Sequence, residues 1–177
     1  MNEEQLLAEI ADKGQLSTKE YLYIASFVRE KAFLVFGTGR DTPYWKLINP
    51  CTTFLENKQE WLDPEDPYQY LVKYTTKISQ SEQLMGSYHS GVYVNLEMKL
   101  PDVIREIEWD VIFVDSPEGY SNNTPGRMQS IYAASQLASP ATDIFIHDVD
   151  RSVEYLWSST LFSKTTKRVD RTAHLRL

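Results

Sequence analysis

Four groups of chemically useful residues each follow an apolar run of strand length. These groups are Gly37–Gly39, Glu56, Asp115 and His147–Asp148. A glycine turn after a strand lets the backbone come close to a ligand, and a carboxylate about 20 residues further on can bind ribose hydroxyls. Because Glu56 stands at about that distance from Gly37, these two groups predict a nucleoside-binding site.

The glycine turn has a second interpretation. A tight connection from a strand to a helix, with Glu56 as a surface carboxylate, gives the same pattern. The dinucleotide fingerprint has Gly or Ala where this sequence has Thr42, so a close approach to a pyrophosphate is less well supported. A nucleoside without phosphates, such as S-adenosylmethionine, suits the turn better. A nicotinamide-dependent oxidoreductase is therefore the least favoured of the functions considered for this sequence.

The last two groups could transfer protons. Asp115 must be solvated or paired, because a buried lone carboxylate is costly, and it either faces a ligand or caps the following turn. His147 is flanked by Asp148 and Asp150. A histidine beside a strand end and carboxylates is typical of a general base or a metal ligand, and a structural histidine is the alternative.

Two arginines, Arg127 and Arg151, stand at predicted helix starts, where the helix dipole disfavours a cation. Bidentate capture of a substrate carboxylate would explain both positions. Salt bridges to Glu118, Asp148 or Glu154 would explain them equally well.

The elements that must position these residues follow from the apolar runs. Strands are predicted at 32–36, 51–55, 70–74, 110–114 and 143–146. Helical patterns separate them, which predicts an α/β fold with a mostly parallel central sheet and helices on both faces. Ligands of such sheets bind beyond the carboxyl ends of the strands, so the four groups lie on one rim.

Along the chain, helices are predicted both before and after the first strand. The first spans 3–12 with Gly14 as its cap, and the second spans 18–31 behind the capping box at Ser17 and Glu20. Further helices are predicted at 43–49, 58–62, 79–85, 125–137 and 153–162. The segment 86–100 is the hardest to interpret, with a short strand at 92–96, and the tail 163–177 forms one or two edge strands.

Composition and charge limit the class of protein. The 177 residues suffice for one sizeable core, so we expect a single domain over 1–177, with helices in 1–31 packed on its core. The net charge of −7 argues against nucleic acid and anionic membranes as partners. The single cysteine excludes an internal disulfide and a multi-thiolate zinc site.

The sequence also predicts where the protein resides. No run approaches the roughly 20 apolar residues that span a bilayer, and the first ten residues are acidic rather than typical of a secretory signal. We therefore expect a soluble, cytoplasmic protein with no membrane span. Its oligomeric state stays open.

Taken in order, the motifs resemble the glucuronoxylan 4-O-methyltransferase family of plant cell-wall biosynthesis. The matching segments are LVFGTG at 34–39, TFLE at 53–56, EWDVIFVD at 108–115, PEGY at 117–120, PGRM at 125–128 and HDVDRSVE at 147–154. The resemblance covers about 16–162. It implies a class I, Rossmann-like methyltransferase fold and S-adenosylmethionine-dependent methyl transfer to O4 of glucuronic acid in a polysaccharide.

The resemblance also implies three sets of site residues. The cofactor-binding set is Phe36, Gly37, Thr38, Gly39, Glu56 and Asp115. The substrate-binding set is Glu118, Tyr120, Arg127 and Arg151, whose arginines would neutralise an acidic sugar. The catalytic set is Asp115, His147 and Asp148, with Asp115 or His147 as the base, and the same three residues are the candidate ligands of a divalent metal.

Two alternatives accompany this prediction. The plant relatives are expected to carry an N-terminal Golgi membrane anchor that this sequence does not show, so a different acidic glycan or a small glucuronide is also an acceptor candidate. A non-catalytic binding or scaffold role in polysaccharide assembly is the second functional hypothesis.

Overall fold

The computed structural model describes residues 2–13 and 16–177, so the cap predicted at Gly14 lies outside the described residues. Within these residues the strands form one seven-stranded sheet in the order β3-β2-β1-β4-β5-β7-β6. The strands are β1 (Phe33–Phe36), β2 (Thr53–Glu56), β3 (Gln69–Leu71), β4 (Val111–Val114), β5 (Asp143–Ile146), β6 (Lys164–Val169) and β7 (Thr172–Arg176).

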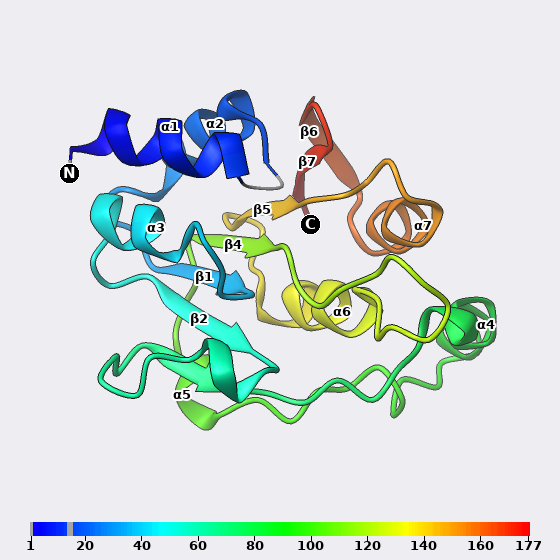
Figure 1. Ribbon diagram of the computed structural model, residues 1–177. Coiled ribbons are helices and arrows are strands. Elements are labelled where there is room, and N and C mark those ends of the chain that lie inside the picture. The colour runs from blue at the N-terminus through cyan, green and yellow to red at the C-terminus, as the bar shows by residue number, and fades with distance from the viewer. Residues whose placement is uncertain (1, 14–15) are drawn as a thin grey trace.

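The sheet is parallel across its first five strands. Its last two strands form an antiparallel hairpin, in which β7 pairs with β5 and β6 is the outer strand. The predicted α/β fold with a mostly parallel sheet is therefore confirmed, and the tail contributes one edge strand, β6. Because the parallel strands end at one side, the loops after β1, β2, β4 and β5 meet there (Figure 1).

Helices cover both faces of the sheet (Figure 1). They are α1 (Glu3–Lys13), α2 (Thr18–Val28), α3 (Thr42–Ile48), α4 (Ser81–His89), α5 (Asp102–Glu106), α6 (Met128–Leu137) and α7 (Ser152–Leu161), with short 3-10 turns η1 (Gln59–Trp61) and η2 (Ile78–Gln80). None of the helices within the described ranges is long and apolar enough to cross a membrane.

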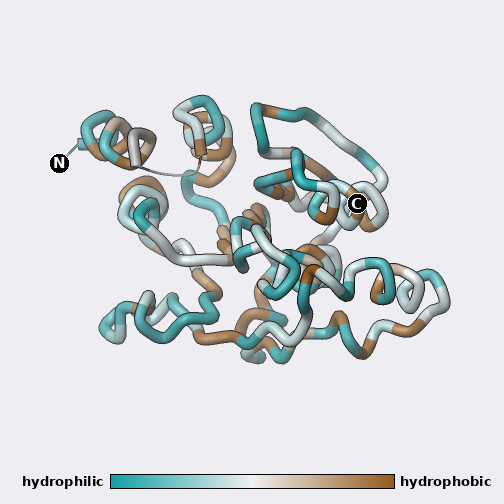
Figure 2. Tube along the Cα trace, turned by 45° about the vertical axis from the view of Figure 1, so that its right-hand side comes forward, coloured by the Kyte–Doolittle hydropathy of each residue, from teal (hydrophilic) through white to brown (hydrophobic). Residues whose placement is uncertain are grey.

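Alternation along the strands divides the core into two parts. In β1, Phe33 and Val35 pack with α1, α2 and α3, whereas Leu34 and Phe36 pack with residues of α4, α6 and α7 on the other face. All four side chains are buried, as expected for a strand covered on both faces. Figure 2 shows hydrophobic stretches at the centre of the molecule, between the helices.

The predicted capping box fixes the start of α2 and ties the helix to the hairpin. Ser17 Oγ accepts from the Glu20 N–H at 3.3 Å, and Glu20 Oε2 accepts from the Ser17 N–H at 2.7 Å. The other Glu20 oxygen accepts from the Thr172 hydroxyl at 2.7 Å and from the Arg171 N–H at 3.1 Å. One buried carboxylate therefore joins α2 to the start of β7.

The short strand predicted at 92–96 is wrong. Leu96, Met98 and Leu100 are buried at alternate positions, but the segment forms turns, with the Leu96 N–H bonded to the Tyr93 carbonyl at 2.7 Å. Alternating burial shows which side chains enter the core and does not require a neighbouring strand. The sequence prediction also missed the short helix α5 that follows.

Candidate active site at the strand ends

A cavity of about 480 Å³ lies where β1, β2 and β4 end, within the usual range for small-molecule sites. Its walls come mainly from the loops that follow these strands. The loop after β1 supplies Gly37, Thr38, Gly39, Arg40 and Asp41. The end of β2 and the loop after it supply Glu56, Asn57, Lys58 and Trp61, and the loop after β4 supplies Asp115, Ser116, Glu118, Gly119 and Tyr120. Arg127, Arg151, Leu16, Tyr21, Val35 and Phe113 complete the lining.

The turn after β1 requires glycine at position 37. Gly37 has φ +117°, and a Cβ there would lie 2.8 Å from the Cβ of Ser116. Gly39 donates its N–H to the Thr42 hydroxyl at 2.9 Å, which fixes the far end of the turn. Phe36 is buried in the core and is not among the cavity residues, unlike the rest of the predicted cofactor set.

Glu56 at the end of β2 organises both loops around it. Its Oε2 accepts from the N–H and the hydroxyl of Thr38, at 2.9 and 3.0 Å. Its Oε1 accepts from the N–H groups of Asn57 and Lys58, at 2.7 and 2.8 Å. Thr38 Oγ1 also lies 3.2 Å from the Trp61 carbonyl oxygen. The Thr38 hydroxyl can therefore donate to Trp61 when a ligand hydroxyl replaces it as a donor to Glu56.

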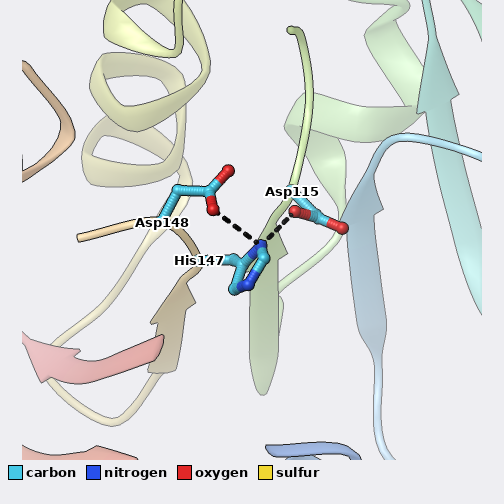
Figure 3. A group of neighbouring side chains, drawn as sticks. All are labelled: Asp115, His147 and Asp148. Carbon is cyan, nitrogen blue, oxygen red and sulfur yellow. Dashed lines mark hydrogen bonds and ion pairs between the residues drawn. The ribbon is translucent and has the colours of Figure 1, made fainter. Parts of the chain in front are cut away.

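Asp115, His147 and Asp148 come together as predicted, at the ends of β4 and β5 (Figure 3). His147 Nδ1 lies 2.8 Å from Asp115 Oδ1 and 3.6 Å from Asp148 Oδ1. Only Asp115 lines the cavity, with 20% of its side chain exposed, whereas His147 and Asp148 are fully buried. Any direct contact with a bound molecule therefore falls to Asp115.

The neighbours of Asp115 favour its ionised form. Burial alone would raise its pKa, but Arg127, with Nη2 at 3.0 Å from Asp115 Oδ1, and the His147 hydrogen bond outweigh burial and lower the pKa. The neighbours of Asp115 thus stabilise its carboxylate form at the cavity wall.

Asp148 is the centre of a buried ion-pair network. Its Oδ2 lies 2.8 Å from Arg127 Nη2 and 2.9 Å from Arg151 Nη1, and its Oδ1 pairs with Arg171. Its backbone has φ +63°, a conformation that Asp adopts more readily than most residues. The network joins the loop after β5 to the starts of α6, α7 and β7.

A divalent metal fits this cluster poorly. Ligand atoms of Asp115, His147 and Asp148 lie within 4.8 Å of one another, which is close enough to share an ion. However, three guanidinium groups already pair with Asp148, and one of them, from Arg127, also pairs with Asp115. Because a metal would meet these cations at close range, we derive no chemical step through one.

The two arginines of the predicted substrate set differ in environment. Arg127 is 2% exposed, and besides its two ion pairs it donates to the carbonyl oxygens of His147 at 2.8 Å and Pro117 at 3.3 Å. The Arg151 side chain is 30% exposed and lines the cavity. Arg127 therefore holds the loops in place, and Arg151 offers charge to a ligand.

The predicted salt bridges of these arginines are confirmed in part. Both pair with Asp148, whereas Glu118 pairs with Lys58 across the cavity at 3.2 Å. Glu154 is buried, and neither of its oxygens has a hydrogen-bond partner among the described residues. Burial raises the pKa of Glu154 above its ordinary value.

The sequence analysis did not include Asp41 among the candidate site residues, although Asp41 lines the cavity. Its side chain makes no cap hydrogen bond and accepts instead from Trp45 Nε1 at 2.8 Å. Burial raises the pKa of Asp41 to about 6, and the negative charge of Asp115 adds to the effect. Its position two residues after the glycine turn was the available signal. Tyr21, Lys58 and Trp61, which also line the cavity, carry no comparable signal.

The strand order, the glycine turn after β1 and the carboxylate that ends β2 define the fold of a class I methyltransferase. Solved structures of the methyltransferase MycE from the mycinamycin biosynthetic pathway, one in complex with Mg and SAH and one with mycinamycin VI in addition, share this fold. They have TM-scores of 0.51 at 11% and 12% identity, and the match covers 99% of this chain and 48% of theirs.

The chain belongs to the IRX15/IRX15L/GXM family, which matches residues 19–176. Three relatives from Arabidopsis thaliana illustrate its range. Glucuronoxylan 4-O-methyltransferase 3 is 37% identical over 75% of this chain and 52% of its own length. Arabinogalactan O-methyltransferase 1 is 36% identical over 69% of this chain and 51% of its own length. Protein IRREGULAR XYLEM 15 is 33% identical over 82% of this chain and 55% of its own length. The chain spans about half the length of these curated relatives, and the resemblance stated from the motifs is confirmed.

Proposed function

We propose that this protein is an S-adenosylmethionine-dependent O-methyltransferase that methylates O4 of glucuronic acid in a glycan or a small glucuronide. The observation that carries the proposal is the single cavity that brings the glycine turn, Glu56 and Asp115 together with the exposed guanidinium of Arg151. The glycine turn, Glu56 and Asp115 suit a nucleoside that carries a charged substituent. The guanidinium of Arg151 suits an acidic acceptor. The names of the glucuronoxylan-methylating relatives support the same acceptor.

The residues around the glycine turn fit the cofactor, which supplies the methyl group when bound. The absence of a Cβ at Gly37 lets the turn pack against Ser116 at the cavity wall, and the cavity volume is adequate. Glu56 would bind the ribose hydroxyls, with Thr38 turning its own hydroxyl to Trp61. Asp41 would bind the α-ammonium group at the methionine end.

Asp115 would act on the acceptor hydroxyl. It lines the cavity and is held by Arg127 and His147. It would accept a hydrogen bond from the O4 hydroxyl and take its proton as the oxygen gains the methyl group, and S-adenosylhomocysteine would be the leaving group. Because His147 is buried, we propose Asp115 as the base and His147 as a residue that positions it.

Arg151 would bind the carboxylate of the acceptor sugar. It is the partly exposed guanidinium that extends from the Asp148 network into the cavity. Tyr120, which is 77% exposed, and Glu118 lie on the same loop and would contact the sugar ring and its hydroxyls. An acidic carbohydrate is therefore the proposed substrate.

A methyl-transfer assay tests the proposal. The protein is incubated with S-adenosylmethionine and glucuronic-acid-substituted xylo-oligosaccharides, and 4-O-methylglucuronic acid is measured by mass spectrometry. We expect product with the wild type, a loss of at least about 100-fold in Asp115→Asn, and a raised KM in Arg151→Gln.

The second candidate function is a non-catalytic scaffold, favoured by the 33% identity to Protein IRREGULAR XYLEM 15, whose name states no activity. Folded wild-type protein that yields no product from any glucuronic-acid acceptor would support this candidate over the enzyme. Product formation at wild-type rate in Asp115→Asn would instead refute the role of that residue.

A further inference from the structure

A second groove lies between α2 and β6, separate from the cavity. It has a volume of about 610 Å³ and is lined by Lys19, Leu22, Tyr23 and Ser26 of α2 and by 167–170 of the hairpin. Figure 1 shows the hairpin standing beside α2 at one edge of the molecule. We call this feature the hairpin groove.

The hairpin groove is basic although the chain carries a net charge of −7. Lys19, Lys167 and Arg168 supply three cations, and all three side chains are exposed. The one acid in the lining, Asp170, already accepts from the Ser17 hydroxyl at 2.6 Å, and its carbonyl accepts from Arg168 Nε at 3.0 Å. The groove therefore presents a positive surface to a ligand.

An aromatic ring lies among these cations in a fixed orientation. Lys167 Nζ lies 4.4 Å from the centroid of the Tyr23 ring, and the Tyr23 hydroxyl is 2.9 Å from His174 Nδ1. Half-buried Tyr23 and exposed Leu22 add apolar surface to the same groove. A sugar ring has an apolar face and, in a uronic acid, a carboxylate, so it matches this combination of ring and cations.

The contacts connect the hairpin groove to the cavity. Arg151 lines the cavity, and it shares the Asp148 carboxylate with Arg171, which is 39% exposed and follows directly after Asp170. On the other side, Leu16 lines the cavity and is next to Ser17, which is bonded to Asp170. A chain of contacts through Arg151, Asp148 and Arg171 thus links one site to the other.

We propose that the hairpin groove binds the extended chain of an acidic glycan whose modified sugar occupies the cavity. The inference rests on the proposed function for the identity of the polymer. It makes recognition depend on acceptor length, because a short acceptor fills the cavity alone and a polymer reaches both sites. Lysines on an outer strand have an alternative role, because they discourage the strand from pairing with another chain. If that were the only role of Lys167, its replacement would not change the affinity for a glycan.

Charge reversal tests the groove by direct binding, without turnover. The double variant Lys19→Glu/Lys167→Glu is compared with Lys73→Glu/Lys99→Glu, two exposed lysines outside both sites. Calorimetry measures binding of polymeric glucuronoxylan, of a xylo-oligosaccharide with one glucuronic acid, and of unsubstituted xylan. Thermal unfolding confirms that each variant is folded.

We expect the groove variant to lose roughly tenfold in affinity for the polymer while the short oligosaccharide and the control variant are unaffected. Wild-type polymer affinity in the groove variant, equal binding of unsubstituted xylan, or no polymer binding by the wild type would each overturn the proposal. Lysine-dependent polymer binding without methyl transfer would uphold the groove and refute the proposed enzyme activity, so the two failures are distinguishable.

Discussion

Two carboxylates that share the cavity, Asp41 and Asp115, are affected in opposite directions by their neighbours. Arg127 and His147 lower the pKa of Asp115, whereas burial raises that of Asp41 to about 6. Asp115 was predictable from the sequence because it directly follows a strand. The role of Asp41 was not, because its burial and its proximity to Asp115 exist only in the folded chain. Unequal carboxylates in one site are typical of a division of tasks.

The substitution Asp41→Asn should stabilise the protein and weaken cofactor binding. A folded-state pKa above the unfolded value means that Asp41 favours folding below about pH 4 and that this contribution is lost as the pH rises through about 6. At pH 7 the free energy of unfolding of the variant should therefore exceed that of the wild type by on the order of 1 to 2 kcal/mol, as measured by chemical denaturation.

The same variant should bind S-adenosylhomocysteine more weakly than the wild type does. Wild-type affinity should fall up to about tenfold from pH 7 to pH 5, because protonated Asp41 no longer attracts the ammonium group. The affinity of 5′-methylthioadenosine, which lacks that group, provides the control and should not change. Equal losses for both ligands would show that Asp41 does not contact the ammonium end.

At the scale of elements, apolar runs located the five parallel strands, and the capping box located the start of α2. The rim was predictable for the same reason, because parallel strands end together. The turns at 92–96 and the short helix α5 were not, since the apolar pattern of a sequence does not reveal which backbone groups form hydrogen bonds. Similarly, the sequence did not show which carboxylate pairs with Arg127, because Asp148 meets this arginine through a tertiary contact.

The junction of β1 and α3 gives a prediction at this scale. Gly37→Ala should destabilise the protein by about 1–3 kcal/mol, because φ +117° is unfavourable for alanine and its Cβ would lie 2.8 Å from the Cβ of Ser116. Gly86→Ala, in α4 with no atom within 4 Å of the new Cβ, is the matched control and should stabilise by about 0.5–1 kcal/mol. Similar unfolding temperatures for the two variants would contradict the strained turn.

At the scale of the molecule, we propose that residues 1–177 form one domain in which α1 and α2 belong to the core. Leu7 and Ile10 of α1 are buried together with residues of α2, α3 and β1. On the site side, Asp148 joins the ends of β5 to the starts of α6, α7 and β7 through three arginines. The binding rim is therefore held by buried charge as well as by packing.

Asp148→Asn should show how much this network contributes. Asparagine keeps the shape and tolerates φ +63°, but it leaves buried Arg127 with one fewer anion, so we expect a loss of about 3–5 kcal/mol in the free energy of unfolding. Asp150→Asn removes one exposed ion pair to Arg171 and should cost less than about 1 kcal/mol. Denaturant titration of both variants measures the difference, and equal losses would mean that the network is not a structural centre.

The most direct test of the account is calorimetric titration of the folded protein with S-adenosylhomocysteine. We predict micromolar binding at one site per chain, weakened at least about tenfold in Glu56→Gln and unchanged in Glu60→Gln, an exposed neighbour outside the cavity. No heat of binding to folded wild-type protein, or equal binding by both variants, would contradict the assignment of the cavity as the cofactor site.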